Sequence, residues 1–407
     1  MTSSLIKKYF AGSPVEYVGW KEWIIPLALF LQGVLTMSPI LPLAGIRGTY
    51  IYALVYVVSV FAILHGHRKI PKVGVVLALG LLIGSCLTAF YWRDFKIAFL
   101  PYFFIGSVLI AGVASKKDIH RFINLCTIFL LIILVLSWIG FIHVISGGES
   151  LFSILNLDGR KNTFYLTTFS NWRVHDSIRP SGVFDEPGTM SFLLCALAAL
   201  RRMYHRGERM SLSMLVAGLV TFSLTHIAFL TLFVFFRSDR TFLRNLSQYL
   251  AICAGVVLVY FFLLKDPIDN AIMWRFKPQP ETYTISGDNR SEQVVLAKSK
   301  LSWKVFLWGL DPTGITKVHA FSKKYGPSTA TPLGPLLTSG IFVSFPYYFF
   351  LLFVMWQGFR RKENLIYLAV VLLFLPRPYV TGYSYAVWAM LFLLSFQWSL
   401  RGAREHE

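Results

Sequence analysis

The segment from Arg179 to Gly188 reads Arg-Pro-Ser-Gly-Val-Phe-Asp-Glu-Pro-Gly, so it combines a cation, two adjacent carboxylates, two prolines and two glycines. Pro187 suits the first position of a helix, because its missing N–H would have no partner there. Glu186 then lies at or beside the N-cap, where free N–H groups and the helix dipole favour an anion. An ionised carboxylate in this place can accept a proton. Glu186 is therefore a candidate general base, and Asp185 is the alternative.

Plainer interpretations of this segment remain open. Glu186 can be a helix cap and nothing more, since the dipole alone justifies a carboxylate there. Arg179 can be an interfacial arginine that binds lipid phosphate or Asp185. Neither explains why so many different residue types gather in ten positions. The same hydrophilic stretch also contains Arg173 and His175, which are candidate substrate-binding residues, although an ordinary loop role is the plainer interpretation of His175.

A second hydrophilic stretch offers another cation. Asn289 is followed three residues later by Glu292, a spacing that predicts a capping box and places Arg290 in the first turn of a helix. An arginine there opposes the helix dipole unless an anion binds, in which case the guanidinium and the free N–H groups face the same phosphate. Arg275 is a weaker candidate for this role, because no local motif fixes it. One amphipathic helix is predicted here from an apolar stripe at three- and four-residue intervals: Val294, Ala297, Leu301, Val305 and Trp308. A helix lying on a membrane surface is the plainer interpretation.

The composition of the chain defines its class. Of 407 residues, 55% are apolar and only 14% are charged, far from a soluble globular average. Apolar runs recur at the length that crosses the hydrocarbon region of a bilayer. The four cysteines all fall inside apolar runs, and no metal-ligand spacing is present. The sequence therefore predicts an all-α polytopic membrane protein, a single membrane-embedded domain over residues 1–407, without a metal site.

The order of the runs gives a topology. Two hydrophilic segments, 147–186 and 265–332, interrupt the apolar runs and are expected to be large loops on the outer side, the second with the amphipathic helix. Lys and Arg in the short connections place both termini in the cytoplasm. This alternation fails at 211–236 unless that run is two short segments broken near Ser223. With the break, about 12 membrane segments are expected.

These features resemble one known family. The order of many spans, an outer loop ending in Arg-x-x-Gly-x-Phe-x-Glu-Pro from Arg179 to Pro187, a broken Ser-x-Thr segment, and a second loop with an Arg-led helix running to Trp308-Gly309 is similar to Wzy-type O-antigen and polysaccharide polymerases. That superfamily also holds the O-antigen ligases. The likeness in layout covers most of the chain, whereas the individual motifs are short.

The resemblance implies a location and a chemistry. Such proteins lie in the inner membrane of Gram-negative bacteria with the active site facing the periplasm. They are GT-C-like glycosyltransferases that use undecaprenyl-pyrophosphate-linked glycans as donor and acceptor, without a metal or other cofactor. Their loop arginines hold the pyrophosphate, a role that maps onto Arg179 and Arg290. A chain-length regulator protein is a further candidate partner beside membrane lipids, and no nucleic acid is expected.

One departure bears on the subfamily. Ligases carry a His-Asn-type motif at the entry to the span after the second loop, whereas this sequence has Pro327-Ser-Thr-Ala-Thr-Pro-Leu-Gly334 there. The missing histidine disfavours a ligase, which stays the alternative in the same class. A transporter or flippase for lipid-linked glycans is the alternative from another class. Transporters place ionisable residues at mid-membrane, and the spans here are nearly free of charge.

Overall fold

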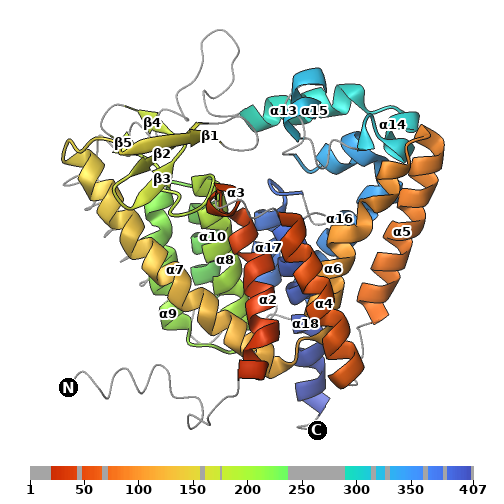
Figure 1. Cartoon of the computed structure of the whole chain (residues 1–407), viewed down its shortest axis with the longest axis horizontal. Coiled ribbons are helices and arrows are strands. Elements are labelled where there is room, and N and C mark those ends of the chain that lie inside the picture. The colour runs from red at the N-terminus through yellow and green to blue at the C-terminus, as the bar shows by residue number, and fades with distance from the viewer. Residues whose placement is uncertain are drawn as a thin grey trace.

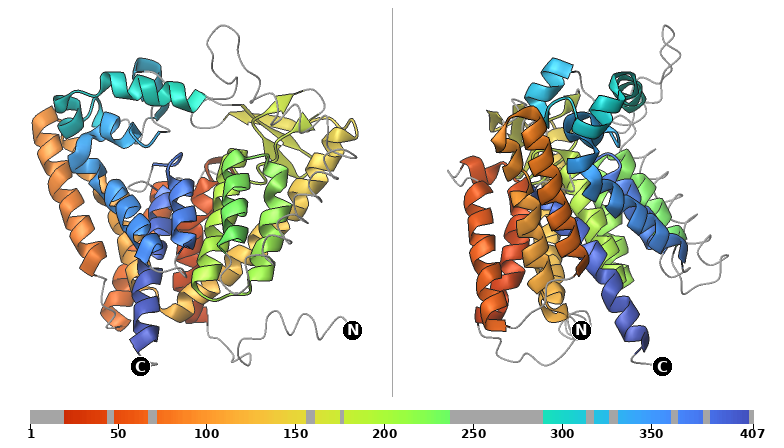
Figure 2. Two further views of the ribbon diagram at one scale, coloured as in Figure 1. Left: turned by 180° about the vertical axis from the view of Figure 1, so that it is seen from behind. Right: turned by 90° about the vertical axis from the view of Figure 1, so that its right-hand side faces the viewer.

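The chain folds as a helical bundle with strands and short helices gathered at one end (Figure 1). The computed structural model describes residues 20–43, 48–66, 72–155, 161–174, 177–236, 289–312, 318–325, 331–360, 365–378 and 383–404. We call the end that holds β1–β5 and Pro187 the strand end, and the end that holds Trp20, Ser115 and Arg202 the opposite end. Figure 2 shows the same two ends from behind and from the side.

The helical elements are η1 (Trp20–Trp23), α2 (Ile24–Gly33), η2 (Leu35–Met37), α3 (Ile40–Leu43), α4 (Gly48–Gly66), α5 (Lys72–Trp92), η3 (Phe95–Phe99), α6 (Pro101–Val113), α7 (Lys116–Ile145), α8 (Pro187–Met203), α9 (Glu208–Ala217), η4 (Gly218–Thr221), α10 (Leu224–Phe235), α13 (Asn289–Lys300), α14 (Trp303–Trp308), α15 (Val318–Tyr325), α16 (Gly334–Arg360), α17 (Ile366–Phe374) and α18 (Tyr383–Arg404). The strands are β1 (Phe152–Leu155), β2 (Lys161–Tyr165), β3 (Thr168–Ser170), β4 (Arg173–Val174) and β5 (Ser177–Ile178).

Four stretches in the described part of the chain are long and apolar enough to cross a membrane: Lys72–Trp92, Phe95–Val113, Lys116–Ile145 and Gly334–Arg360. Shorter apolar helices accompany them, at Ile24–Met37, Tyr50–Leu64, Leu224–Phe235 and Ser384–Ser395. Many large apolar side chains of α4, α5 and α7 are exposed on the outside of the bundle. A surface of this kind is suited to lipid rather than water. The protein is thus a mostly helical, membrane-associated protein, as predicted. The apolar run at 246–264 lies outside the described residues.

Helix α8 is the centre of the bundle. Every side chain from Leu193 to Leu200 is completely buried, and α7, α9, α10, α17 and α18 all contact this helix. A helix that is apolar on all sides is stable only when other elements surround it. Because α8 begins at Pro187, Glu186 lies at the N-terminus of this central helix, at the strand end.

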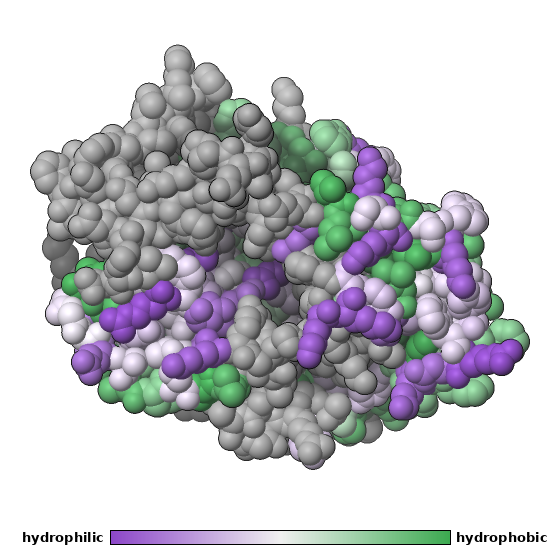
Figure 3. Space-filling view, turned by 90° about the horizontal axis from the view of Figure 1, so that it is seen from above, coloured by the Kyte–Doolittle hydropathy of each residue, from purple (hydrophilic) through white to green (hydrophobic). Residues whose placement is uncertain are grey.

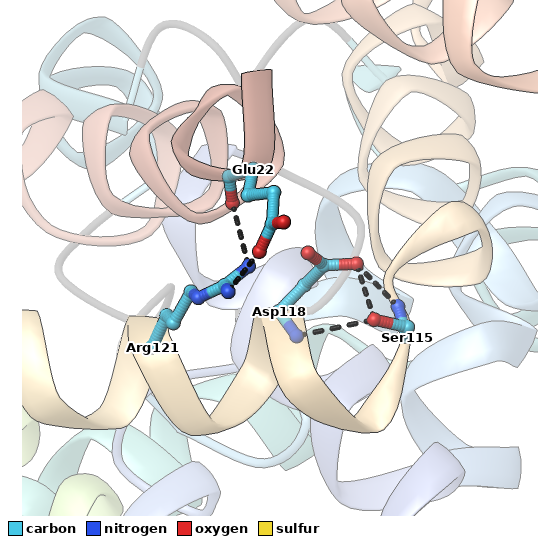
Figure 4. Close-up of polar contacts among 4 residues, drawn as sticks. All are labelled: Glu22, Ser115, Asp118 and Arg121. Atoms are coloured by element: carbon cyan, nitrogen blue, oxygen red, sulfur yellow. Dashed lines mark hydrogen bonds and ion pairs between the residues drawn. The ribbon is translucent and has the colours of Figure 1, made fainter. Parts of the chain in front are cut away.

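Helix α7 is the longest helix of the bundle, and its start is fixed by a reciprocal cap. The Ser115 hydroxyl accepts from the Asp118 backbone N–H at 3.2 Å, and Asp118 Oδ2 accepts from the Ser115 backbone N–H at 2.8 Å. This pair is a capping box, which satisfies N–H groups that have no partner within the helix. One turn later, Arg121 forms an ion pair with Glu22 of η1. Figure 4 shows both contacts side by side at the opposite end.

The predicted break in the run 211–236 is confirmed. Helix α9 passes into η4, Phe222 adopts a left-handed conformation with φ of 48°, and α10 starts after Ser223. Arg202, at the end of α8, lies 3.5 Å from Glu208 at the start of α9 and also donates to the Phe233 carbonyl near the end of α10, at 3.1 Å. The start of α9 and the end of α10 therefore both lie at the opposite end of the bundle, and η4 between them lies toward the strand end. We call α9, η4 and α10 the α9–α10 unit and η4 its apex. The run 211–236 is thus two short helices that fold back on each other.

The hydrophilic segment 147–186 is not only loop, and in this respect the all-α prediction is wrong. Strands β1, β2 and β3 form an antiparallel sheet in sequence order, and β4 pairs with β5 in a second, two-stranded sheet. Phe152 faces Phe164 across the first pair and Phe164 faces Phe169 across the next. These three rings pack together, with Phe152 and Phe164 stacked at 5.0 Å. Cross-strand aromatic contacts of this type stabilise a small sheet. The strands are short and contain many polar residues, so no long alternating pattern in the sequence predicts them.

The amphipathic stretch after Asn289 also differs from its prediction. It forms two helices, because Ser302 ends the first and caps α14 by accepting from the Val305 N–H at 3.3 Å. Its stripe does face one side, but Ala297 and Val305 are buried against Phe321 and Leu337. The stretch thus packs on the protein's own α15 and α16, and the prediction of one continuous helix is wrong.

Candidate functional site

Glu186 lies at the junction between the strands and α8. Its backbone is extended, with φ of −153° and ψ of 154°, and its carbonyl accepts from the Thr189 N–H at 3.0 Å. Pro187 occupies the first helical position, as predicted. The Glu186 side chain makes no capping hydrogen bond to α8. Instead, its carboxylate forms an ion pair with the guanidinium of Arg377.

Arg377 enters the site from the far end of the sequence. It lies between α17 and α18, flanked by Pro376 and Pro378. The side chains of the pair are only 18% and 19% exposed, for Arg377 and Glu186 respectively. The arginine also passes close to Gly188, where an added Cβ would lie 2.4 Å from Arg377 Nη2. A glycine at this position of α8 therefore makes room for the ion pair.

The charge state of Arg377 follows from its surroundings. Burial alone would lower the pKa of the guanidinium, but the charges of Glu186, Tyr385 and Asp185 together outweigh burial and raise the pKa above the ordinary arginine value. Arg377 is therefore a permanent cation at any physiological pH. Its partner carboxylates, Asp185 and Glu186, are adjacent in sequence, so one guanidinium lies within the electrostatic reach of both.

Asp185 is fixed from two sides. Its Oδ1 accepts from the Thr189 hydroxyl at 2.9 Å, and its carbonyl accepts from Asn162 Nδ2 at 3.2 Å. Asn162 belongs to β2 and is completely buried. The carboxylate pair is consequently attached both to the first turn of α8 and to the strands, which leaves its backbone little freedom.

Arg179 is oriented toward the apex of the α9–α10 unit. Its Nε donates to the Thr221 carbonyl of η4 at 3.1 Å, and its own carbonyl accepts from the Ser170 hydroxyl at 2.8 Å. Between Arg179 and Glu186, Gly182 has φ of +62°, and a Cβ there would lie 2.2 Å from Ile133. Only glycine adopts this conformation without strain and fits so close to α7. The chain can therefore turn from β5 into α8 against the bundle core.

The other predicted residues are placed to different degrees. Arg173 is exposed on β4, with its guanidinium carbon 5.8 Å from the centre of the Tyr165 ring, a cation–π contact. Arg290 lies in the first turn of α13, as predicted, and α13 lies at the strand end (Figure 1). His175 and Arg275 lie outside the described residues. The structure thus brings Asp185 and Glu186 together, and it adds Arg377 to them.

An apolar cavity of about 370 Å³ lies next to the chain segment that carries Arg377. It is lined by residues of α10, α13 and α17, by the chain just before α16 and by the chain just after α17: Leu224, Thr225, Ala228, Val294, Thr331, Pro332, Leu372, Leu375 and Pro376. Pro376 directly precedes Arg377, and Val294 lies one helical turn after Arg290. The strand end, seen from above in Figure 3, is hollowed near its middle, and hydrophilic residues lie within the hollow. A carboxylate–guanidinium pair and an apolar cavity are therefore neighbours at this end.

The prediction from sequence missed Arg377. A signal was present, because Arg377 stands alone between two prolines and two apolar runs, where a charged residue needs a partner. What the sequence could not show is that α17 and α18 both pack on α8, which brings this connection to Glu186.

The described residues contain no group of three or more His, Cys, Asp or Glu side chains that could hold a metal ion. No family model, curated protein or solved structure matches the chain. The fold and the site are those of a helical, membrane-associated protein with a carboxylate–guanidinium pair at the N-terminus of its central helix.

Proposed function

We propose that this protein is a polysaccharide polymerase of the bacterial inner membrane, a glycosyltransferase that joins repeat units linked to undecaprenyl pyrophosphate. The observation that carries the proposal is the ion pair between Glu186 and Arg377 at the start of the buried helix α8, beside an apolar cavity. A lipid-linked pyrophosphate needs cations for its head and apolar surface for its chain, and the strand end offers both. The resemblance in motif order to Wzy-type polymerases agrees with this chemistry.

The proposed reaction assigns a role to each charged group. A hydroxyl oxygen of the acceptor sugar attacks the anomeric carbon of the donor, and the bond from that carbon to the pyrophosphate oxygen breaks. The leaving pyrophosphate keeps the electron pair and gains negative charge, which Arg179 and Arg290 stabilise. The proton of the acceptor hydroxyl passes to the Glu186 carboxylate, the general base. Asp185 and Arg173 help to bind the substrate, together with His175 and Arg275.

In the proposed reaction, Arg377 holds the Glu186 carboxylate until the substrate binds. Without substrate, its guanidinium neutralises the Glu186 carboxylate, so that neither charge is left unpaired in a largely buried place. An arriving pyrophosphate offers Arg377 a second, more highly charged partner that it can hold through two parallel hydrogen bonds. Transfer of the guanidinium toward the phosphate would release the carboxylate to accept a proton.

The placement in the membrane is part of the proposal. The long apolar helices support insertion, and the excess of Lys and Arg in short connections at the opposite end supports a cytoplasmic location for that end. The strand end then faces the periplasm, where polymerisation takes place in proteins of this type. The proposal includes about 12 membrane segments in a GT-C-like arrangement and a chain-length regulator as partner.

Purified protein supplied with a single lipid-linked repeat unit tests the proposal. We expect a ladder of products, and we expect Glu186→Gln to slow its formation by about 100-fold or more, as for loss of a general base. Arg179→Ala and Arg290→Ala should each slow it as well. Glu149→Gln and Lys96→Gln are matched controls, because both side chains are exposed and neither belongs to the site. An unchanged ladder in the Glu186→Gln and Arg290→Ala variants would show the assignment to be wrong.

The same preparation separates the alternatives. A ligase would transfer glycan from the lipid carrier to a different acceptor, without producing a ladder from the repeat unit alone. A transporter would move the lipid-linked unit across a vesicle membrane without forming a new bond, which a leaflet-specific label on the sugar detects. Either result, obtained without a ladder, would replace the polymerase proposal.

A further inference from the structure

The end of α8 that lies away from Glu186 carries a buried arginine with neutral partners only. Arg201 is 7% exposed. Its Nη1 donates to the Thr127 hydroxyl at 2.8 Å, and its Nε donates to the Ser211 hydroxyl at 3.2 Å. A buried guanidinium is costly unless an opposite charge compensates it. Two hydroxyl groups leave that positive charge uncompensated.

A second arginine lies next to the first and adds to the charge. The Arg206 backbone N–H donates to the Arg201 carbonyl at 2.7 Å, and the two guanidinium groups lie within electrostatic reach of each other. Arg206 Nε donates to His120 Nδ1 at 2.9 Å, and Lys116 is also within electrostatic reach of His120. We call Arg201, Arg206, His120 and Lys116 the Arg201 cluster.

The geometry fixes the form of His120. Because Nδ1 accepts a hydrogen bond from Arg206, the neutral ring carries its proton on Nε2. No hydrogen-bond partner for Nε2 occurs among the residues that the structure describes. The ring therefore presents a free donor on the side away from Arg206. Arginine, histidine and lysine donors together form a set that accepts an anion and excludes a cation.

The carboxylates described at this end are engaged elsewhere. Asp118 completes the cap on Ser115, and Glu22 pairs with Arg121, as Figure 4 shows. Glu208 lies 3.5 Å from Arg202. These hydrogen bonds and ion pairs all join groups outside the Arg201 cluster. Among the residues that the structure describes, these ion pairs leave the positive charge of the cluster without a counter-charge.

We infer that the Arg201 cluster binds one phosphate-type anion, either the headgroup phosphate of an anionic phospholipid or free inorganic phosphate. Phosphate oxygens match the fork of an arginine and can accept from His120 Nε2 at the same time. The cluster is formed where α7 begins and α8 ends, which is where a bilayer-spanning bundle meets lipid headgroups. This site lies at the opposite end from Glu186, and it is independent of the proposed polymerase activity.

Native mass spectrometry of the purified full-length protein tests this inference. Protein reconstituted with phosphatidylglycerol and phosphatidylcholine, then extracted into mild detergent, should retain one phosphatidylglycerol molecule. The Arg206→Gln variant should bind this lipid at least about tenfold more weakly, as expected for loss of one charge-assisted hydrogen bond. Arg209→Gln is the matched control, because Arg209 is exposed in the same connection and lies outside the cluster; its lipid retention should equal that of the native protein.

A second arm distinguishes the two sources of phosphate. Protein in phosphatidylcholine alone is titrated with inorganic phosphate, and its thermal unfolding is followed. If phosphate stabilises the native protein but not the Arg206→Gln variant, and if the first arm shows no retained phosphatidylglycerol, free phosphate is the ligand. The His120→Phe variant lacks the Nε2 donor but has the same charge as the neutral histidine. It should bind either ligand more weakly. If the native protein retains neither ligand, or if Arg206→Gln and Arg209→Gln behave alike, the inference is wrong.

Discussion

Arg377 and Glu186 form an ion pair that joins the connection between the last two helices to the N-terminus of the central helix. Each residue alone has an ordinary explanation: a carboxylate at a helix start, and a cation in a short outer connection. Together they are a largely buried pair of opposite charges, within the reach of Asp185 and beside an apolar cavity. This relationship turns two unremarkable positions into one candidate site.

The ion pair should contribute measurably to stability. Arg377→Ala leaves the Glu186 carboxylate in a largely buried place without its partner, so we expect the free energy of unfolding to fall by about 2 kcal/mol. Glu186→Gln should cost less, because the remaining guanidinium can reach Asp185. Thermal unfolding in detergent measures both single variants and the double variant. The interaction free energy from this cycle should be at least about 0.5 kcal/mol. Additive single effects would mean that the pair contributes nothing to stability.

Gly188→Ala should displace Arg377 without unfolding the bundle. The new Cβ would lie 2.4 Å from Arg377 Nη2, which is the far end of a flexible side chain and can move. We expect product formation to fall by about tenfold or more, whereas the unfolding temperature changes little, since alanine is a better helix former than glycine. Gly207→Ala is the control, because nothing lies within 4 Å of its added Cβ. Equal activity in the two variants would contradict the role of Gly188.

The contact between α14 and α16 should depend on Gly340. Gly340 has φ of +68° at a kink in α16, and a Cβ there would lie 2.2 Å from the Leu307 carbonyl oxygen. Backbone cannot move aside as a side chain does, so Gly340→Ala should separate α14 from α16 and expose the amides of Leu310 and Asp311, which donate to Leu337 and Thr338. Hydrogen exchange measures this loss of protection.

Gly147→Ala provides the comparison for that variant. Gly147 has a similar left-handed backbone, with φ of +85°, but nothing lies within 4 Å of an added Cβ. Its cost should be limited to the backbone strain of about 1 kcal/mol. If Gly340→Ala destabilises the protein no more than Gly147→Ala does, the close approach of the two backbones is unimportant.

The sequence predicted the features that depend on composition and on neighbours along the chain. The apolar runs in the described part of the chain became helices, Pro187 became the first residue of α8, and the run 211–236 broke before Ser223. The strands of 147–186 were missed, because their stability comes from cross-strand contacts such as Phe152 with Phe164 rather than from long alternating runs.

The candidate site was only half predicted for the same reason. Asp185 and Glu186 are neighbours in the sequence, so their crowding was visible. The partner of Glu186 depends on the packing of α17 and α18 against α8, which no local pattern specifies. The division of the amphipathic stretch at Ser302 is similar, since the helix that Ser302 caps buries Val305 with Phe321 and Leu337, which are distant in the sequence.

Arg202 should hold the two ends of the α9–α10 unit together. It lies 3.5 Å from Glu208 Oε1 and donates to the Phe233 carbonyl, and its guanidinium carbon is 5.4 Å from the centre of the Phe233 ring. Arg202→Gln removes the ion pair and the cation–π contact, so the C-terminal turn of α10 should fray. We expect amide exchange at 233–236 to rise by about tenfold, which corresponds to about 1.4 kcal/mol, with little change at 224–228 near the apex.

The comparison with Arg209→Gln shows whether that effect is specific. Arg209 is exposed on the first turn of α9, one residue beyond Glu208, and its loss removes the same charge from the same connection. Exchange at 233–236 should stay at the native level in this variant. If both variants raise exchange equally, the loss of positive charge explains the effect, and Arg202 does not act as a clamp. If exchange rises instead at 224–228, the apex rather than the two ends is the weak part of the unit, because η4 and Phe222 already interrupt its helical hydrogen bonds.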